Sequence, residues 1–407
     1  MERYINSFAT ENDIQTALQN GELLKPYVAY IEDADRIDWN SKEKVDYTTE
    51  YLTFNILSAG TINWTASNTA ITKTIDYKLN DGEWTSITSN TGSSAPTITV
   101  KAGDKLQFRG SNAQYATDYS NYNSFSGSTA LFEAEGNIMS LIYGDDFKNN
   151  LTISSTYAFA SLFRDCAKLV SAENLVLPAT ALANYCYQSM FGGCTSLTTA
   201  PELPATTLAS GCYNGMFSNC KNLTTAPALP ATILAQSCYS AIFNGCSSLT
   251  AAPALPATTL ANYCYNGMFK GCTSLTTAPA LPATTLANGC YYQMFQNCTS
   301  LTTAPALPAT VLAEECYRGM FWGCTSLTTA PELPATILKE SCYRDMFYVC
   351  AKLNYIKCLA TKITAYSCTD GWVYKVASTG TFVKNPNMTS WTTGNSGIPT
   401  GWTVQDA

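Results

Sequence analysis

Apolar positions recur every 26 residues through the second half of the chain, where each unit reads close to SLTTAPALPATTLANYCYNGMFKGC. The period is marked by Phe191, Phe217, Phe243, Phe269, Phe295, Phe321 and Phe347. A unit of this size cannot bury its own apolar face, so neighbouring units must stack and share one continuous core. The pattern predicts a solenoid, an extended architecture with a large surface that is typical of binding proteins.

Two short elements are expected in each unit. Residues 197–200 should form a strand that Pro201 ends, because proline cannot donate a hydrogen bond to a strand ladder. Residues 209–217 should form a short helix, since Cys212, Met216 and Cys220 recur at the spacing of one helical stripe.

The solenoid is expected to span residues 148–350 and to change at both ends. Its first unit, around Phe163, precedes Phe191 by 28 residues and lacks the first cysteine of later units. After Cys350 one degenerate unit keeps a cysteine, Cys368, in register. Residues 351–407 should therefore contain this degenerate repeat and a C-terminal cap, which a stacked array needs at an exposed end.

A period of two governs residues 46–147. Residues 75–79 and 84–87 flank the polar sequence NDGE, which is a hairpin signature. Further strands are predicted at 51–56, 98–100, 106–108 and 138–141, with turn signals at roughly ten-residue spacing. We expect a β-sandwich.

Residues 1–45 predict a small acidic head with a helix at 11–20 and strands at 27–31 and 36–39. Its Asp33, Asp35 and Asp38 lack the glycine and the distal glutamate of a calcium loop, so a solvated turn is favoured. The expected fold is multi-domain α+β: an α/β head, a β-sandwich, and a solenoid of 26-residue units with its cap.

Composition limits the chemistry. The 407 residues include no histidine, which excludes Ser-His-Asp and Cys-His nucleophile systems. The net charge of −7 and the lack of a Lys/Arg stripe argue against a nucleic-acid partner. The first residues show no export signal and no apolar run is long enough to cross a bilayer, so neither export nor membrane insertion is expected.

The 17 cysteines include pairs eight residues apart in seven units, from Cys186/Cys194 to Cys342/Cys350. Eight residues of helix span about 12 Å, whereas a disulfide needs Cα atoms within about 7 Å. Free thiols stacked in the core are therefore expected, with no metal and no cofactor.

Two columns of the repeat vary from unit to unit, as exposed positions do. In the last units they carry Tyr292, Arg318, Trp322, Arg344 and Tyr348, which should lie close together. Tyr, Trp and Arg are enriched at binding hot spots, so these residues form a candidate recognition patch. The alternative, that Trp322 and Tyr348 pack against the cap or a second protomer, stays open.

A second candidate is the aromatic loop with Tyr115, Tyr119, Tyr122 and Phe125, which could contact sugar rings or a partner chain. Packing of these rings onto the sandwich is favoured instead. The adjacent carboxylates Asp145-Asp146 cannot lie across a glycosidic bond, so no enzyme is expected.

The F-x-x-C-x-x-L core followed by TTAP-x-LPAT resembles the BspA-like leucine-rich repeats of Bacteroidetes surface proteins and of their phages. The opening INSF…GELLKPYVAYIED is similar to the amino-terminal segment of virion proteins of Bacteroides phages, including crAss-like ones, and GTFVKNPNMTSWTTGNSGIPTGW resembles the tail that closes such arrays.

This resemblance implies a virion fibre or decoration protein, made in the host cytoplasm. Residues 1–45 would contact other virion proteins, the solenoid would bind a host-surface glycan or protein, and a homotrimer would be the assembly. Avidity would then compensate for weak single contacts. The alternative is a bacterial surface adhesin that binds host matrix or other cells.

Overall fold

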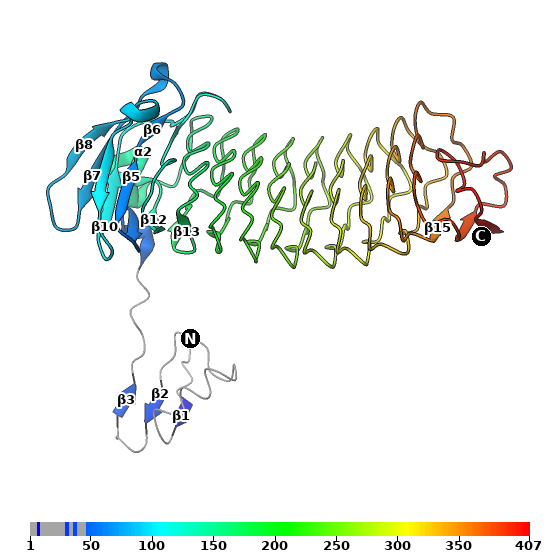
Figure 1. Ribbon diagram of the computed structural model, residues 1–407, viewed down its shortest axis with the longest axis horizontal. Helices are drawn as coiled ribbons and strands as arrows, with labels where there is room; N and C mark the ends of the chain where they lie inside the picture. The colour runs from blue at the N-terminus through cyan, green and yellow to red at the C-terminus, as the bar shows by residue number, and fades with distance from the viewer. Residues whose placement is uncertain (1–5, 9–28, 32–35, 39–45) are drawn as a thin grey trace. The chain divides into compact units, whose positions relative to one another are not determined.

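In the computed structural model, residues 6–8, 29–31, 36–38 and 46–407 are described, and the chain divides into two compact units, Met1–Tyr47 and Thr48–Ala407 (Figure 1). In the first unit, β1 (Asn6–Phe8) pairs in parallel with β2 (Ala29–Ile31), and β2 pairs antiparallel with β3 (Arg36–Asp38). β2 and β3 confirm the strands predicted at 27–31 and 36–39, and they pair as a hairpin. The predicted helix at 11–20 and the side chains of Asp33 and Asp35 lie outside the described residues.

The second unit begins with a β-rich region whose main sheet has the order β13-β12-β4-β10-β7-β8. Of two further small sheets, β5-β9 packs Ile62, Ile98 and Val100 into the same core, and β6-β11 adds a short two-stranded pairing. The bounds are β4 Leu52–Ile56, β5 Gly60–Asn63, β6 Thr65–Ala66, β7 Thr74–Leu79, β8 Thr85–Thr88, β9 Thr97–Val100, β10 Lys105–Arg109, β11 Asn123–Ser124, β12 Phe132–Asn137, β13 Leu169–Ser171 and β14 Leu175–Val176. Short 3-10 turns are η2 Tyr47–Thr49, η3 Thr69–Ile71, η4 Gly92–Ser94 and η5 Gly144–Asn149.

The predicted hairpin is confirmed, with Thr74 of β7 opposite Thr88 of β8. The strand predicted at 138–141 is wrong: Ser140–Tyr143 is the α-helix α2, and the strand, β12, ends at Asn137. The Asn137 side chain accepts the Met139 N–H at 3.0 Å and turns the chain. A short apolar run buried on all sides has no period that distinguishes strand from helix.

The β-rich region and the repeats share one hydrophobic core, which extends without a break from Leu52 to Trp402. The connection is a shared sheet, because β12 pairs in parallel with β13 and β14, which belong to the first coil of the array. Figure 1 shows the coils stacked in sequence beyond this sheet.

The helix predicted in each repeat is wrong. Residues 209–217 and their equivalents form a ribbon of consecutive four-residue turns. Every second N–H donates within its own turn, as Met216 does to the Tyr213 carbonyl at 3.1 Å. The N–H groups between them donate to the next coil, as Gly215 does to Ser240 at 2.8 Å. The ribbon thus satisfies its backbone both locally and across coils, which a helix could not do.

The predicted strand at 197–200 shrinks to single parallel bridges between coils, such as Thr225 with Ala251 and Thr277 with Thr303. The proline that follows each of these bridges has no N–H with which to continue the ladder.

The turn ribbon requires left-handed backbone at every fourth position. In one coil these positions are Gly211 (φ 59°), Gly215 (φ 62°) and Asn219 (φ 61°). Each is the third residue of a turn, where a type II turn needs positive φ. Along the stack, a long side chain at such a position is commonly followed one coil later by glycine: Tyr185 lies over Gly211, and an added Cβ there would be 2.3 Å from the Tyr185 ring.

This arrangement predicts unequal effects at two glycines with the same φ. Gly267→Ala, whose new Cβ would meet only the Lys270 Cβ at 3.9 Å, should lower the free energy of unfolding by about 1–2 kcal/mol, the usual penalty for left-handed alanine. Gly211→Ala should lower it further, because the new Cβ displaces the Tyr185 ring. Urea titrations test this, and Tyr185→Ala should be non-additive with Gly211→Ala. Equal losses at the two glycines would contradict the packing described here.

Two aromatic columns run through the core of the coils. Ring centroids in the phenylalanine column, from Phe163 to Phe347, are 5.2–5.8 Å apart. Those in the tyrosine column, from Tyr187 to Tyr343, are 5.7–6.2 Å apart. Every ring in these two columns is buried, so each coil supplies one layer of a continuous core.

All 17 cysteines are free and buried, which confirms the thiol prediction although the helix used to argue it is absent. The second cysteine of each repeat donates its S–H to a phenylalanine carbonyl of the preceding coil, as Cys220 does to Phe191 at 3.1 Å. Burial raises the pKa of these thiols, to about 12 for Cys298.

The described chain ends in a parallel sheet of β15 (Tyr355–Cys358), β16 (Thr381–Lys384) and β17 (Thr403–Asp406). Trp372 is fully buried there and continues both aromatic columns, with ring centroids 6.2 Å from Tyr343 and 6.3 Å from Phe347. Its indole N–H donates to the Gly397 carbonyl at 2.8 Å, which ties the last residues to the end of the stack.

Candidate functional site: a ridge patch on the turn ribbon

The five residues singled out from the variable columns lie half-buried on the outward side of the turn ribbon. The structure brings them together with four others that contact them. We name the whole set the ridge patch; it comprises Tyr263, Tyr292, Glu315, Arg318, Trp322, Arg344, Asp345, Tyr348 and Tyr374.

Arg318 is the centre of the first half of the ridge patch. Its guanidinium lies over the Tyr292 ring, 5.3 Å from the centroid, and forms an ion pair with Glu315. Tyr263 donates its hydroxyl to the other Glu315 carboxylate oxygen at 2.9 Å. Acceptance of this hydrogen bond by Glu315 is the main reason that the pKa of Tyr263 is raised.

Tyr263 reaches Glu315, two coils further on, because glycine stands between them. A Cβ on Gly289 would lie 2.2 Å from the Tyr263 ring. Tyr263 and Glu315 both occupy left-handed positions, with φ of 55° and 53°, where a side chain is disfavoured.

The rings of Trp322, Tyr348 and Tyr374 form the second half of the ridge patch. The centroids of Trp322 and Tyr348 are 4.6 Å apart, and those of Tyr348 and Tyr374 are 4.7 Å apart. Tyr374 belongs to the degenerate repeat, so Tyr348 does contact the region predicted as a cap. All three rings nevertheless remain partly exposed.

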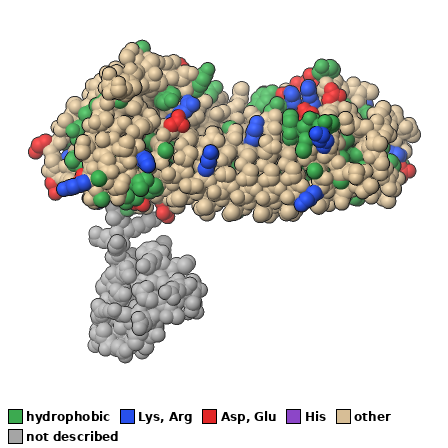
Figure 2. Space-filling model, in the orientation of Figure 1, with side chains coloured by type: hydrophobic (Ala, Val, Ile, Leu, Met, Phe, Trp, Pro, Cys, Tyr) green, Lys and Arg blue, Asp and Glu red, His purple; other side chains and the backbone are tan. Residues whose placement is uncertain are grey.

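Asp345 connects the two halves. It pairs with Arg344, Nε to Oδ2, at 3.5 Å. Burial raises the pKa of Asp345, and the charges of Arg344 and Arg318 oppose that shift. Figure 2 shows hydrophobic, basic and acidic side chains gathered over the C-terminal half of the array, while the middle of the same face is mostly uncharged.

Comparison of the repeats with one another did not identify four members of the ridge patch: Tyr263, Glu315, Asp345 and Tyr374. The first three lie at left-handed positions, and the available signal was the replacement of glycine by a larger residue in those columns. Tyr374 was hidden because its repeat is degenerate.

The second candidate, the aromatic loop, is corrected by the structure. Tyr115 and Phe125 are fully buried in the core, and the Tyr115 hydroxyl donates to the Leu141 carbonyl at 2.6 Å. Tyr122 is half-buried under Arg164, and only Tyr119, at 69% exposure, points fully into solvent. Burial of these rings stabilises the fold because it removes apolar surface from water. The aromatic residues therefore pack the loop against the β-rich region.

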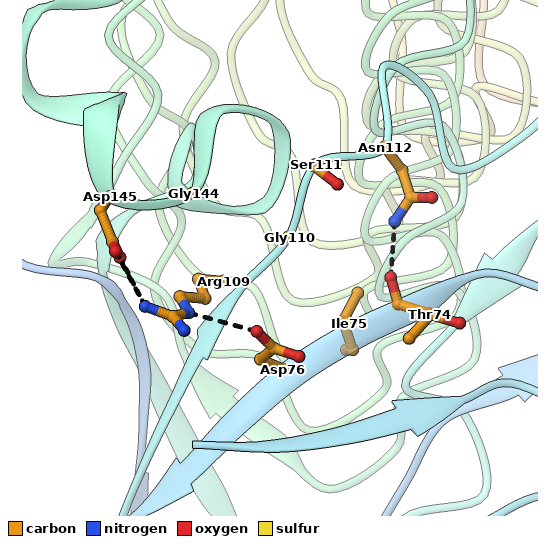
Figure 3. Close-up of a pocket in the computed structure, with 9 residues that line it drawn as sticks. All are labelled: Thr74, Ile75, Asp76, Arg109, Gly110, Ser111, Asn112, Gly144 and Asp145. Atoms are coloured by element: carbon orange, nitrogen blue, oxygen red, sulfur yellow. Dashed lines mark hydrogen bonds and ion pairs between the residues drawn. The ribbon is translucent and has the colours of Figure 1, made fainter. Parts of the chain in front are cut away.

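A polar pocket of about 340 Å³ lies at the edge of the β-rich region, between β7, the end of β10 and η5 (Figure 3). Arg109 crosses it and pairs with Asp76 at 3.3 Å and Asp145 at 2.8 Å. Hydrogen bonds from Tyr51 and Arg109 lower the pKa of Asp145. Both carboxylates are therefore engaged by one arginine, and the pocket holds an internal ion-pair network.

Within residues 46–407, no cluster of three or more acidic or cysteine side chains is arranged to hold a metal ion. None of the helices described in the chain is long and apolar enough to cross a membrane.

Comparison with curated proteins found no match. Among solved structures, a leucine-rich repeat protein from Bacteroides ovatus is similar at 15% identity, over 61% of this chain and 77% of that one, with a TM-score of 0.26. The family model for the BspA type leucine rich repeat region matches residues 160–302 and 262–370. These ranges cover just over half of the sequence and contain the stacked coils described above, so the chain belongs to the BspA-type leucine-rich repeat family.

Proposed function

We propose that the protein is a non-catalytic recognition protein that binds a cell surface through the ridge patch. The observation that supports this most directly is the set of partly buried Tyr, Trp and Arg side chains held in place by one another. Such residues dominate binding energy at interfaces, and side chains already fixed in position lose less entropy on binding. Neither a nucleic-acid nor a membrane partner is part of the proposal.

A more specific proposal concerns the particle or cell that carries the protein. We infer a virion fibre or decoration role from the resemblance of the opening residues to Bacteroides phage virion proteins, with residues 1–45 as the anchor and a homotrimer as the assembly. A bacterial surface adhesin is the second candidate, because the repeats belong to the BspA-type family and resemble those of Bacteroidetes surface proteins. Binding of the full chain, but not of a chain lacking residues 1–45, to phage particles would support the first.

The main test removes two anchors. Arg318→Ala with Trp322→Ala should weaken binding of the labelled full-length chain to Bacteroides cells by tenfold or more, measured by flow cytometry across a panel of strains. The matched control is Asn214→Ala with Ser218→Ala, which changes the same two columns in an early coil. Unchanged binding by the Arg318/Trp322 variant would contradict the proposal.

A second variant separates binding from folding. Glu315→Gly installs the residue that the same column already uses at 211 and 289, so the fold should be retained with little change in stability. It also frees Arg318 and Tyr263 from their common partner. We expect weaker binding at near-native melting temperature, whereas Ser237→Gly, in the same column outside the ridge patch, should leave binding intact.

A further inference from the structure

We infer that the partner of the ridge patch is a folded protein surface and not a glycan. This rests on the proposed function and specifies its ligand class. Four features of the ridge patch carry the inference: the engaged ring faces, the free polar tips, the absence of patch residues from the described cavities, and the pairing of its charges.

The aromatic rings of the ridge patch already have neighbours against at least one side. Trp322, Tyr348 and Tyr374 pack on one another, with centroids 4.6 and 4.7 Å apart. Arg318 covers a face of Tyr292, and the Lys375 ammonium lies 5.3 Å from the centre of the Tyr374 ring. A saccharide binds an aromatic side chain by packing its C–H groups on an open ring face. These contacts leave less open ring face for a saccharide and leave the ring edges available.

Those edges end in hydrogen-bonding groups. The hydroxyls of Tyr292, Tyr348 and Tyr374 and the Trp322 indole N–H form no hydrogen bond within the described residues and are not buried. Amphipathic rings that present polar tips from a rigid base are the usual anchors of protein-binding surfaces, where they meet backbone carbonyls and side chains.

The described cavities lie elsewhere. Three cavities of about 270–510 Å³ are described: one is lined by residues of 74–76, 109–112 and 144–145, one by Glu173 and residues of 200–204 and 227–230, and one by residues 306–308, Glu332 and Pro334. No ridge-patch residue lines any of these three cavities. A small ligand is normally held in a concave site that buries most of its surface. A ridge extending over several coils instead suits a large partner with a complementary surface.

The charges on the ridge patch are paired. Arg318 pairs with Glu315, each with 27% of its side chain exposed, and Arg344 pairs with Asp345, at 37% and 21%, so neither guanidinium of the ridge patch is free to hold an acidic polysaccharide. Mixed charges at the rim of an interface instead give specificity toward a partner with a matching pattern.

The test compares two treatments of the target cells, using the full-length chain, the Arg318→Ala/Trp322→Ala variant and the Asn214→Ala/Ser218→Ala control. Proteinase K should reduce wild-type binding at least tenfold, to the level of the Arg318/Trp322 variant. Sodium periodate, which cleaves vicinal diols of sugars, should change it by less than twofold.

Large periodate sensitivity, with or without protease sensitivity, would overturn the inference and assign the patch to a glycan. That result would leave the proposed function intact, provided that the Arg318/Trp322 variant still binds less than wild type. If the variant binds like wild type on untreated cells, the proposed function itself fails, whatever the treatments show.

Discussion

Raising the pH from 8 to 10 is expected to unfold the repeat array abruptly. All 17 cysteines are buried as neutral thiols, and burial raises the pKa of each, for example to about 12 for Cys212, Cys246 and Cys298. In the unfolded chain they titrate near 9. Between pH 9 and 12 the unfolded state therefore loses protons that the native state keeps, so stability falls as pH rises.

The size of this effect follows from linkage. One unit above the unfolded pKa, at pH 10, each protected thiol lowers the free energy of unfolding by about 1.4 kcal/mol. Together the thiols contribute a loss on the order of 20 kcal/mol, which exceeds the 5–15 kcal/mol typical of folded domains. Below about pH 8 the same groups contribute no pH dependence.

Circular dichroism and urea midpoints measured from pH 7 to 11 test this expectation. Replacing Cys238, Cys264 and Cys290 by alanine should make the loss of stability with pH less steep, because three titrating groups are removed. A native spectrum that persists at pH 11, or rapid reaction of the folded protein with a thiol reagent at pH 8, would show that the thiols are not protected as described.

Phe269→Ala should lower the free energy of unfolding by about 3–5 kcal/mol, the usual range for a buried phenylalanine. Phe269 is fully buried in the middle of its column, 5.8 Å from Phe243 and 5.7 Å from Phe295 between ring centroids. Truncation leaves a cavity between two coils, and a stacked array depends on contacts between neighbours. The two flanking segments should therefore also lose cooperativity.

Urea denaturation followed by fluorescence and circular dichroism should show a lower midpoint and a broader transition for Phe269→Ala. Phe269→Leu keeps most of the side-chain volume, so its free energy of unfolding should fall much less than that of Phe269→Ala. Lys270→Ala, at the neighbouring outward position, is the surface control. A loss below 1 kcal/mol for Phe269→Ala would mean that the coils do not share a continuous core.

The solenoid could be predicted from sequence because the 26-residue period reports stacking directly. The secondary structure within a repeat could not be predicted in the same way. Cys212, Met216 and Cys220 are buried at intervals of four, which fits a helical stripe and also fits a ribbon of four-residue turns. The discriminating signal was Gly211 and Gly215 at the same interval, since glycine disfavours a helix and favours left-handed turns.

Part of the ridge patch was accessible from sequence for a similar reason. Tyr292, Arg318 and Trp322 stand out because their columns vary freely, and the register of the repeat then places them on adjacent coils. Glu315 and Tyr263 could not be placed, because their contact spans two coils and depends on the absence of a side chain at Gly289. That contact depends on three-dimensional packing between repeats.

The pairing of long side chains with glycine one coil later also limits how the gene can change. Unequal recombination between near-identical repeats adds or removes whole coils, and each event brings two previously separated coils into contact. Removing the coil of Gly289 would set Glu315 directly against Tyr263, and removing that of Gly211 would set Ser237 against the Tyr185 ring. Repeat number in such a protein is therefore constrained by which neighbours remain compatible, and not by the length of the array alone.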